Sequence, residues 1–327
     1  MTETDTTQSS VKHWDAFWRA RDRSAQPEDP GASDRAPVRF WTSLFETEFA
    51  GREDVRLIDV ASGHGAVTAI AIDAAATANT HLYANCVDYS KSAIEEVCRR
   101  FPQVQGVACD SSLIPYSDRA FDLVVSQFGI EYAGQHAFEE AARLVDANGV
   151  FAALVHLQGG AIHEECADNV AVIHALNETR FLPLARAAFA AGFDLIAGKL
   201  TDPEFQEFDK ELAPAVELAK GILAEKGSRA AGGLLARVYR DIAYMYSRMQ
   251  NYRSDDVFAW FDGIADELRS YEGRMVSMTQ CALDDSDIAS VVTGIARRGF
   301  KVEPPEVLAL SKNGRPGAWI LVARLSR

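Results

Sequence analysis

Residues 56–67, RLIDVASGHGAV, combine an apolar run with a glycine-containing turn, a pattern that suits ligand binding through the backbone. The run includes Asp59, which could fix the turn or reach a ligand's ammonium group through water. Gly63 and Gly65 follow, and without side chains they let the backbone approach a ligand closely. An alanine-rich helical pattern begins at Ala66. We therefore expect a nucleotide-type ligand where a buried strand runs into a helix.

Two further apolar runs also end in residues that could recognise a nucleoside. The second run ends in Asp88, about 20 residues beyond the glycines, where one carboxylate can accept hydrogen bonds from both ribose hydroxyls. Tyr89 follows and is placed to cover an adenine base. The third run ends in Asp110 and Ser111, which could bind an exocyclic amine and a ring nitrogen. Each signal alone is weak, but their order along the chain favours a nucleoside site.

The fourth and fifth apolar runs end in residues that could act on a substrate. Gln127 and Phe128 end the fourth run, near the place expected for a transferred group, and Glu131 and Tyr132 follow as candidate substrate contacts. His156, near the end of the fifth run, is the best-placed imidazole and a candidate general base. The alternative is a buried, hydrogen-bonded histidine at the edge of the sheet.

The elements that must position these residues follow from the hydrophobic pattern. Near-continuous apolar strands separated by helices indicate an α/β fold with a parallel sheet covered on both faces. In such a sheet, ligands bind beyond the carboxyl ends of the strands, where the strand order reverses. The predicted strands are residues 55–60, 81–88, 104–110, 121–128 and 150–157, and the predicted helices between them are 66–76, 90–101 and 136–145.

The two ends of the chain add further predicted elements. Residues 11–22 should form an amphipathic helix, because Trp14, Phe17 and Trp18 recur at helical spacing. A second helix is expected at 38–49, and another at 284–298. The chain closes with a hairpin of 301–311 and 318–325, so that one antiparallel strand joins the sheet.

Residues 159–275 have almost no strand pattern and a strong helical pattern, and they are too long for a loop. We therefore predict a core of residues 1–158 and 276–327, and a helical insertion of 159–275 that caps the substrate. Arg240 and Tyr244 share one helical face and could bind an aromatic or anionic acceptor. The alternative is that this face pairs with acids on neighbouring helices.

Composition narrows the possible partners. The net charge of −14 opposes attraction to nucleic acid or an anionic bilayer and favours a small-molecule substrate. No apolar run approaches the roughly 20 residues of a membrane span. Five scattered cysteines and a polar start favour a reduced, cytoplasmic protein. The adjacent residues 163–166, HEEC, point in different directions on a helix, so we expect no metal. The oligomeric state stays open.

The glycine turn and the strand ends resemble those of a known family. The spacing D-x-A-x-G-x-G from Asp59 to Gly65 resembles motif I of the class I S-adenosylmethionine-dependent methyltransferases. Ala61 stands where many members have glycine, and a small residue preserves the turn. Residues 126–132, SQFGIEY, are similar to motif IV of the ubiquinone and menaquinone methyltransferase group. The closing hairpin resembles the reversed seventh strand of the family.

The resemblance implies a Rossmann-like, doubly wound, mainly parallel seven-stranded sheet with an antiparallel last strand, plus the inserted helices. It implies S-adenosyl-L-methionine as cofactor and methyl transfer to an O, N or C nucleophile by in-line displacement. N-terminal segments of such enzymes often close over the cofactor, which makes Trp18 a candidate lid residue. The implied cofactor contacts are Trp18, Asp59, Ser62, Gly63, Gly65, Asp88, Tyr89, Asp110, Ser111, Gln127 and Phe128.

Three alternatives remain at this point. A nicotinamide-dependent dehydrogenase also uses a glycine turn and a ribose carboxylate, but here Thr68 replaces the third glycine of its G-x-G-x-x-G fingerprint. A non-catalytic S-adenosylmethionine-binding partner or regulator would keep the same strand ends. A transferase could also use S-adenosylmethionine to move a group other than methyl.

Overall fold

The computed structural model describes residues 14, 15, 17, 34–310 and 314–325. The chain divides into two compact units: one contains the described residues up to 164 and from 277 onward, and the other contains residues 165–276. Helices α6 (Ala161–Glu178) and α10 (Ser254–Gln280) each contain one of the points where the chain passes between the units.

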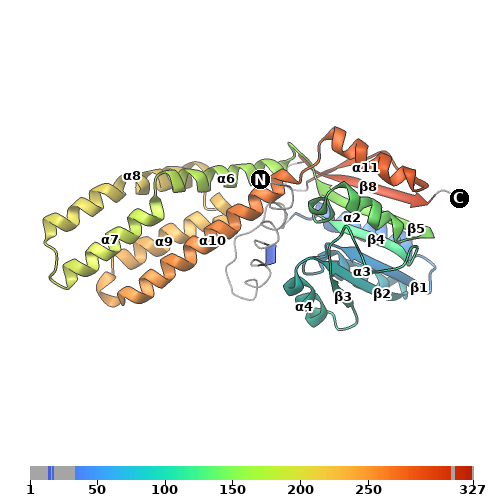
Figure 1. Cartoon of the computed structure of the whole chain (residues 1–327), viewed down its shortest axis with the longest axis horizontal. Helices are drawn as coiled ribbons and strands as arrows, with labels where there is room; N and C mark the ends of the chain where they lie inside the picture. Colours follow the sequence, from blue (N-terminus) through green and yellow to red (C-terminus); the bar gives the residue numbers. More distant parts are fainter. Residues whose placement is uncertain (1–13, 16, 18–33, 311–313, 326–327) are drawn as a thin grey trace. The chain divides into compact units, whose positions relative to one another are not determined.

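The first unit is built on one mixed sheet, in the order β3-β2-β1-β4-β5-β8-β6, with β7 also pairing with β8. Strands β1 to β5 are parallel, and β8 runs antiparallel to β5, β6 and β7 (Figure 1). The strands are β1 (Asp54–Val60), β2 (His81–Asp88), β3 (Gln105–Ala108), β4 (Phe121–Gln127), β5 (Val145–His156), β6 (Phe300–Val302), β7 (Glu306–Ala309) and β8 (Pro316–Leu325).

The predicted mainly parallel sheet with a reversed strand near its end is confirmed. The described residues form eight strands because the predicted strand at 301–311 is divided into β6 and β7. Pro304 and Pro305 lie between them, and proline cannot donate a ladder hydrogen bond. Both short strands still pair with β8, so the predicted hairpin is retained.

Helices cover both faces of this sheet, and alternate residues of each buried strand supply the two cores. In β1, Val55 and Leu57 pack with α2 (Ala36–Phe49) and α3 (Ala66–Ala78). Ile58 and Val60 belong to the other core, with α5 (Gln135–Arg143) and α11 (Asp285–Arg297). Helix α4 (Lys91–Arg100) packs against β2 and β3, and Ser90 caps it as predicted, accepting a hydrogen bond from the Ala93 amide at 3.2 Å.

Strand β5 begins earlier than predicted. The sequence predicts a turn at 148–149, but the chain stays in the sheet and forms an irregularity, where the pairing moves from Phe121↔Val145 to Leu123↔Val150. Gly149 allows this because a Cβ atom there would lie 2.8 Å from the Asp122 carbonyl oxygen. The bend leaves the carboxyl end of β5 in register with β4.

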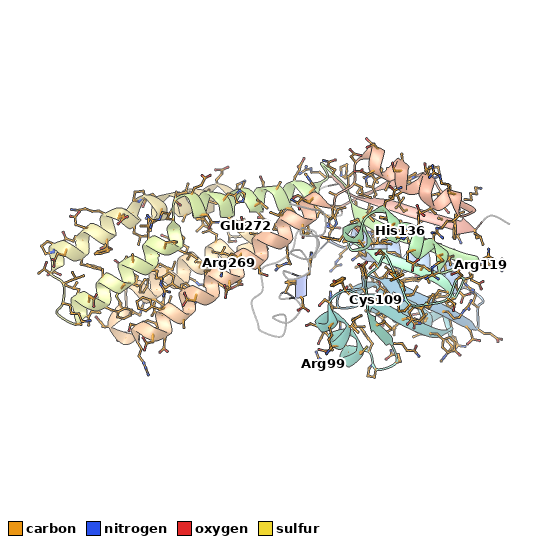
Figure 2. All side chains as sticks on the ribbon, in the orientation of Figure 1. Arg99, Cys109, Arg119, His136, Arg269 and Glu272 are labelled. Carbon is orange, nitrogen blue, oxygen red and sulfur yellow. The ribbon has the colours of Figure 1, made fainter. Side chains whose placement is uncertain are left out.

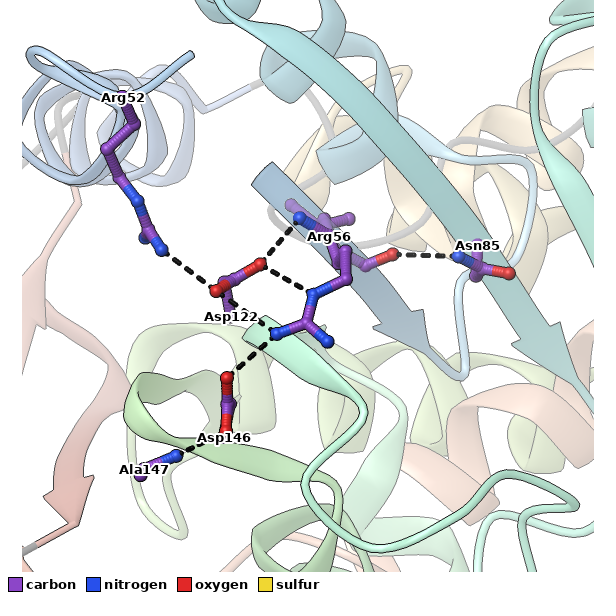
Figure 3. A network of polar contacts seen from close by, with 7 residues as sticks. Arg52, Arg56, Asn85, Asp122, Asp146 and Ala147 are labelled. Atoms are coloured by element: carbon purple, nitrogen blue, oxygen red, sulfur yellow. Dashed lines mark hydrogen bonds and ion pairs between the residues drawn. The ribbon is translucent and has the colours of Figure 1, made fainter. Parts of the chain in front are cut away.

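The amino edge of the sheet is held by a network of ion pairs (Figure 3). Asp122 accepts from Arg52 at 2.8 Å and from Arg56 at 3.0 Å, and Arg56 also contacts Asp146 at 2.8 Å. Burial alone would raise the pKa of Asp122, but hydrogen bonds from Arg56 and the charges of both arginines hold it below its ordinary value. This network joins β1, β4 and β5 at the edge opposite to their carboxyl ends.

The second unit consists of helices joined by short turns, as predicted, and residues 165–276 contain no strand. Phe189 lies in its core, with ring centroids 5.2 Å from Tyr246 and 5.4 Å from Phe261. Glu272 on α10, labelled in Figure 2, contacts His174 on α6 at 2.9 Å. Its helices are the rest of α6, α7 (Phe181–Ile196), α8 (Asp202–Lys226), α9 (Leu234–Tyr246) and most of α10, with the 3-10 turns η2 (Ala230–Gly233) and η3 (Met249–Asn251).

Among the described residues, no helix is both long and apolar enough to cross a membrane.

Candidate active site

The carboxyl ends of β1 and β2 are joined by a single carboxylate. Asp88 accepts a hydrogen bond from the Gly63 amide through Oδ2 at 2.8 Å and from the Ser90 amide through Oδ1 at 2.8 Å. The Ser62 amide donates to the Val87 carbonyl at 3.0 Å. The glycine turn and the predicted ribose acid therefore lie side by side. Burial, assisted by the nearby charge of Asp15, raises the pKa of Asp88.

Three residues of the turn adopt the left-handed backbone conformation that favours glycine: Ala61 at φ 54°, Gly63 at φ 52° and Gly65 at φ 77°. For Ala61 this conformation costs about 1–2 kcal/mol. A Cβ atom at Gly129, beyond the end of β4, would lie 2.5 Å from the Ala61 Cβ atom. The methyl group of Ala61 therefore takes the space that Gly129 leaves open.

Asp59 supports the turn from beneath. Its Oδ2 atom accepts from the Thr68 hydroxyl at 2.7 Å and from the Thr68 amide at 3.2 Å, in the first turn of α3. The side chain is buried, and burial raises its pKa to about 7. These contacts correspond to the first of the two roles predicted for Asp59, in which its carboxylate fixes the turn. The hydrogen-bond partner of Asp59 is Thr68, which stands where the dehydrogenase fingerprint has its third glycine.

The end of β3 continues the same edge, because the Cys109 amide donates to the Asp88 carbonyl at 2.9 Å. Asp110 is exposed, and its Oδ1 atom accepts from the amide and hydroxyl of Ser112 at 2.8 and 2.7 Å. Tyr89 and Leu113 are 53% and 77% exposed, which is unusual for large apolar side chains. Leu113 lies in a loop, and no sequence pattern distinguished it; Ser111 is buried.

Gln127 contacts a neighbouring helix. Its Oε1 atom accepts from the Trp41 indole at 2.7 Å, which ties the end of β4 to α2. The oxygen keeps a second lone pair and the amide nitrogen keeps its hydrogens, so contact of Gln127 with the cofactor stays a prediction. Phe128 follows at φ 54°, and its ring lies 4.8 Å from the His156 ring.

His156 and Glu131 form a buried pair at the ends of β5 and β4. Glu131 lies in the 3-10 turn η1 (Ile130–Ala133), and its Oε1 atom contacts the His156 Nδ1 atom at 2.6 Å and accepts from the His156 amide at 3.0 Å. In the tautomer that pairs with an ionised Glu131, Nδ1 donates to the carboxylate and Nε2 presents its lone pair. Nε2 is buried and has no hydrogen-bond partner among the described residues.

This pairing bears on two predictions. The Oε1 atom of Glu131 contacts His156 because the two strand ends are neighbours in the sheet, and contact of Glu131 with substrate stays a prediction. His156 is buried and hydrogen-bonded, which agrees with its interpretation as a structural histidine. Its Nε2 atom has no partner among the described residues, so His156 also keeps the nitrogen that a general base needs. Whether Tyr132 contacts substrate stays a prediction.

Aromatic rings surround this pair. The Tyr132 ring lies 6.0 Å from the His156 ring and 5.9 Å from that of Trp14, in edge-on geometry. Asp15, next to Trp14, accepts from the Ser90 hydroxyl at 2.8 Å. These N-terminal residues therefore reach both the end of β2 and the turn after β4. Trp18, the predicted lid residue, lies outside the described residues.

A segment distant in sequence also reaches His156. The Leu283 amide donates to the His156 carbonyl at 2.8 Å, and Leu283 forms an isolated parallel bridge with Leu157. This pairing brings the Cys281 Sγ atom to 3.9 Å from Nδ1 of His156. Beside Glu131, a recess of about 160 Å³ lies between η1, α5 and α11. Neither Cys281 nor the recess was predicted.

In the helical unit, the predicted acceptor residues form surface contacts. Arg240 contacts its neighbour Asp241 at 3.2 Å, and Tyr244 is 53% exposed beneath the guanidinium of Arg248, 4.2 Å from the ring centroid. Their role in acceptor binding stays a prediction.

The Asp88 geometry yields a direct prediction. Asp88→Asn should raise the Kd for S-adenosylhomocysteine by about 10- to 150-fold, since each hydrogen bond to a charged group contributes about 1.5–3 kcal/mol. An asparagine has one acceptor oxygen and cannot serve Gly63, Ser90 and two hydroxyl groups together. Isothermal titration calorimetry measures the change. Glu95→Gln, an exposed acid on α4, is the matched control, and equal affinities of D88N and E95Q would contradict the assignment.

Part of this chain matches a known protein family. Residues 58–153 match the family described as "Methyltransferase domain". The matched region extends from β1 into β5 and contains the glycine turn, Asp88, Asp110 and the end of β4. A search of curated proteins finds no match to this chain.

Solved structures overlap part of the chain. A chain in the structure of a complex between the Haloferax volcanii Trm112 methyltransferase activator and a methyltransferase is 18% identical over 44% of this chain and 61% of its own, with a TM-score of 0.34. An Aquifex aeolicus S-adenosylmethionine-dependent methyltransferase is 15% identical over 37% and 68%, with a TM-score of 0.31. Haemonchus contortus phosphoethanolamine N-methyltransferase 1, solved with phosphoethanolamine and S-adenosylhomocysteine, is 15% identical over 48% and 34%, with a TM-score of 0.35. The chain thus spans about three fifths of the first of these proteins.

Proposed function

We propose that this chain, which carries a class I S-adenosylmethionine-dependent methyltransferase domain, methylates a small molecule at an O, N or C nucleophile. The observation that carries the proposal is the hydrogen bond from the Gly63 amide to Asp88, which unites the glycine turn and the ribose acid at one sheet edge. The net charge of −14 supports a small-molecule acceptor over nucleic acid.

The residues at this edge fit the cofactor. Each oxygen of Asp88 accepts one backbone amide and retains a second lone pair, so the carboxylate can also accept both ribose hydroxyls. Tyr89 and Leu113 offer exposed apolar surface suited to a planar base. S-adenosylmethionine supplies a methyl group that its sulfonium has already activated. The protein must therefore hold the acceptor in line with that group and exclude water.

His156 is proposed as the general base for an O–H or N–H acceptor. When bound, S-adenosylmethionine would supply the methyl group, its C–S bond breaking to leave a neutral thioether. Nε2 of His156 would take the acceptor's proton, and Glu131 at Nδ1 would stabilise the resulting imidazolium. Glu131 acts through His156 and is a positioning residue. A carbanion acceptor that arrives already deprotonated would not need this step.

The helical unit is proposed to select the acceptor, with Arg240 and Tyr244 as contacts. Tyr244→Ala should raise the KM for the acceptor several-fold and leave the Kd for S-adenosylhomocysteine unchanged. Ala243→Ser, at the adjacent exposed position, is the control. If Y244A and R240A both leave the KM for the acceptor unchanged, this face does not bind the acceptor and is a solvated helix surface.

Two measurements test the proposed function. Calorimetry should show binding of S-adenosylhomocysteine and none of NAD, because Thr68, the residue that breaks the dehydrogenase fingerprint, is bonded to Asp59. A panel of phenols, amines, carboxylates and enolisable ketones, assayed with methyl-labelled cofactor, should then identify a methylated product. Binding of NAD alone would overturn the proposal.

A non-catalytic cofactor-binding protein is the second candidate. It would show the same affinity for S-adenosylhomocysteine and persistent inactivity on every acceptor. The buried Nε2 lone pair of His156 favours the enzyme, because an unpaired buried nitrogen costs about 1–3 kcal/mol and a mere binding protein gains nothing from it.

A further inference from the structure

We propose that Glu131, His156 and Cys281 form a Zn²⁺ site, and that Zn²⁺ bound there prevents His156 from acting as a base. The first half of this proposal stands on the geometry of the three side chains. The second half rests on the proposed function. The three residues come from η1, the end of β5 and the segment after α10, so only the fold brings them together.

The three donor atoms are already close. One donor atom from each side chain lies within 4.8 Å of the other two. Nδ1 of His156 is 2.6 Å from Oε1 of Glu131 and 3.9 Å from Sγ of Cys281. Bonds of about 2.0–2.3 Å in tetrahedral geometry separate two zinc ligands by roughly 3.2–3.8 Å. A shift of about an ångström in Glu131 would open the set to that spacing.

The donor types select the metal. Imidazole nitrogen, thiolate sulfur and carboxylate oxygen are the three donors that Zn²⁺ uses in proteins, whereas Mg²⁺ and Ca²⁺ prefer oxygen alone. Three protein ligands leave the fourth position to water. Oε2 of Glu131 is buried and has no hydrogen-bond partner among the described residues, so the carboxylate has an unused donor to offer.

A recess lies beside one of the three proposed ligands. It has a volume of about 160 Å³, is lined by Glu131 and not by His156 or Cys281, and is large enough to hold water. Its polar lining residues are Glu131, Gln135, Asp287 and Ser290, and no lysine or arginine lines it. Its charge therefore favours a cation. Cys281 is partly exposed, which makes its thiol accessible.

Zn²⁺ binding and base catalysis compete for the same imidazole. The metal takes the lone pair of Nδ1, so the ring proton moves from Nδ1 to Nε2, and the Cys281 thiol releases its proton to water. Nε2 then carries a proton and cannot accept one from the acceptor. The 2.6 Å contact to Glu131 is replaced by coordination, and the same three residues serve either the base or the metal.

The test is Zn²⁺ titration of the full chain after treatment with a chelator, in competition with a chromophoric chelator. We expect one equivalent to bind, and Cys281→Ser to weaken the affinity at least about 10- to 100-fold, since even losing a residue that supports a ligand costs that much. Cys98→Ser, a partly buried thiol on α4, is the matched control and should bind like the wild type. With Co²⁺ as probe, the thiolate charge-transfer absorption should appear in C98S and be missing in C281S.

Each outcome decides one half of the proposal. Equal Zn²⁺ affinities of the wild type and C281S, or absence of binding, would overturn the site. If the site holds, Zn²⁺ should inhibit methyl transfer by the wild type and C98S, and C281S should stay active at the same Zn²⁺ concentration. Binding to the expected residues without inhibition would overturn the competition and count against His156 as the base, while the cofactor titrations and the acceptor panel test the proposed function separately.

Discussion

Replacing His156 by glutamine is expected to lower kcat for an O–H or N–H acceptor by about 10²- to 10⁴-fold, the usual contribution of a general base. The Kd for S-adenosylhomocysteine should stay unchanged, because His156 ends β5, whereas Gly63, Asp88 and Asp110, which are proposed to contact the cofactor, lie at the carboxyl ends of β1, β2 and β3. Single-turnover methyl transfer and calorimetry measure the two quantities.

Glutamine is the informative replacement because His156 is buried beside a carboxylate. Its side-chain amide can donate to Glu131 as Nδ1 does, so the carboxylate keeps a partner. His156→Ala would leave Glu131 buried with only a backbone donor, and such a loss costs several kcal/mol. Thermal unfolding therefore accompanies each assay.

The outcome separates a base from a structural residue. If H156Q loses cofactor affinity and turnover to the same extent, His156 supports the fold of the site and is not the base. If H156Q retains turnover with an acceptor that ionises readily and loses it with a weakly acidic one, the base role gains support, because only the second acceptor needs help with its proton. Glu131→Gln should show the same acceptor dependence at smaller amplitude.

The sequence predicts the parts of the site that depend on one strand end at a time. Asp59, Gly63 and Asp88 each follow an apolar run, and in a parallel sheet all such ends meet at one edge. The hydrogen bond from the Gly63 amide to Asp88 is a consequence of that rule, because β1 and β2 are neighbours. The reversed β8 is predictable for a similar reason, since a short turn joins two extended runs.

Other features of the site depend on which side chains contact each other in the folded protein, and the sequence does not predict these contacts. Glu131 and His156 are 25 residues apart, and Cys281 is 125 residues beyond His156, so no local pattern joins them. Gln127 suits a ligand site in type and position, and its oxygen also accepts from the nearby indole of Trp41. Such pairings are decided by packing, which spacing along the chain does not encode.

The second large expected effect concerns Asp59, whose ionisation should make the free energy of unfolding depend on pH. Its pKa in the folded protein is about 7, because burial disfavours the charge, and its ordinary value is 3.8. Well below pH 3.8 the carboxyl is protonated in both states and costs nothing. As the pH rises from 4 to 7 the unfolded state releases its proton first, so the free energy of unfolding falls by about 4 kcal/mol and then stays level.

Asp59→Asn removes this titration and keeps the contacts. Both hydrogen bonds from Thr68 go to one oxygen, Oδ2, and the amide oxygen of asparagine can accept both. At pH 8 we expect D59N to be more stable than the wild type by about 2–4 kcal/mol, the gain being reduced because a neutral acceptor bonds less strongly than a charged one. At pH 4 the two proteins should unfold at nearly the same urea concentration.

Urea unfolding at pH 4 and pH 8 measures the difference, with Asp73→Asn, an exposed acid on α3, as the control that should follow the wild type at both pH values. If D59N and the wild type differ equally at both pH values, Asp59 is not charged at high cost in the folded state.

A protein that buries a carboxyl group under its glycine turn gives up stability at neutral pH. We expect a compensating gain in cofactor binding, because a negative charge beneath the turn would attract the positively charged sulfonium of S-adenosylmethionine more than the neutral thioether of the product. D59N should accordingly lose affinity for S-adenosylmethionine more than for S-adenosylhomocysteine, and equal losses would show that Asp59 serves the turn alone.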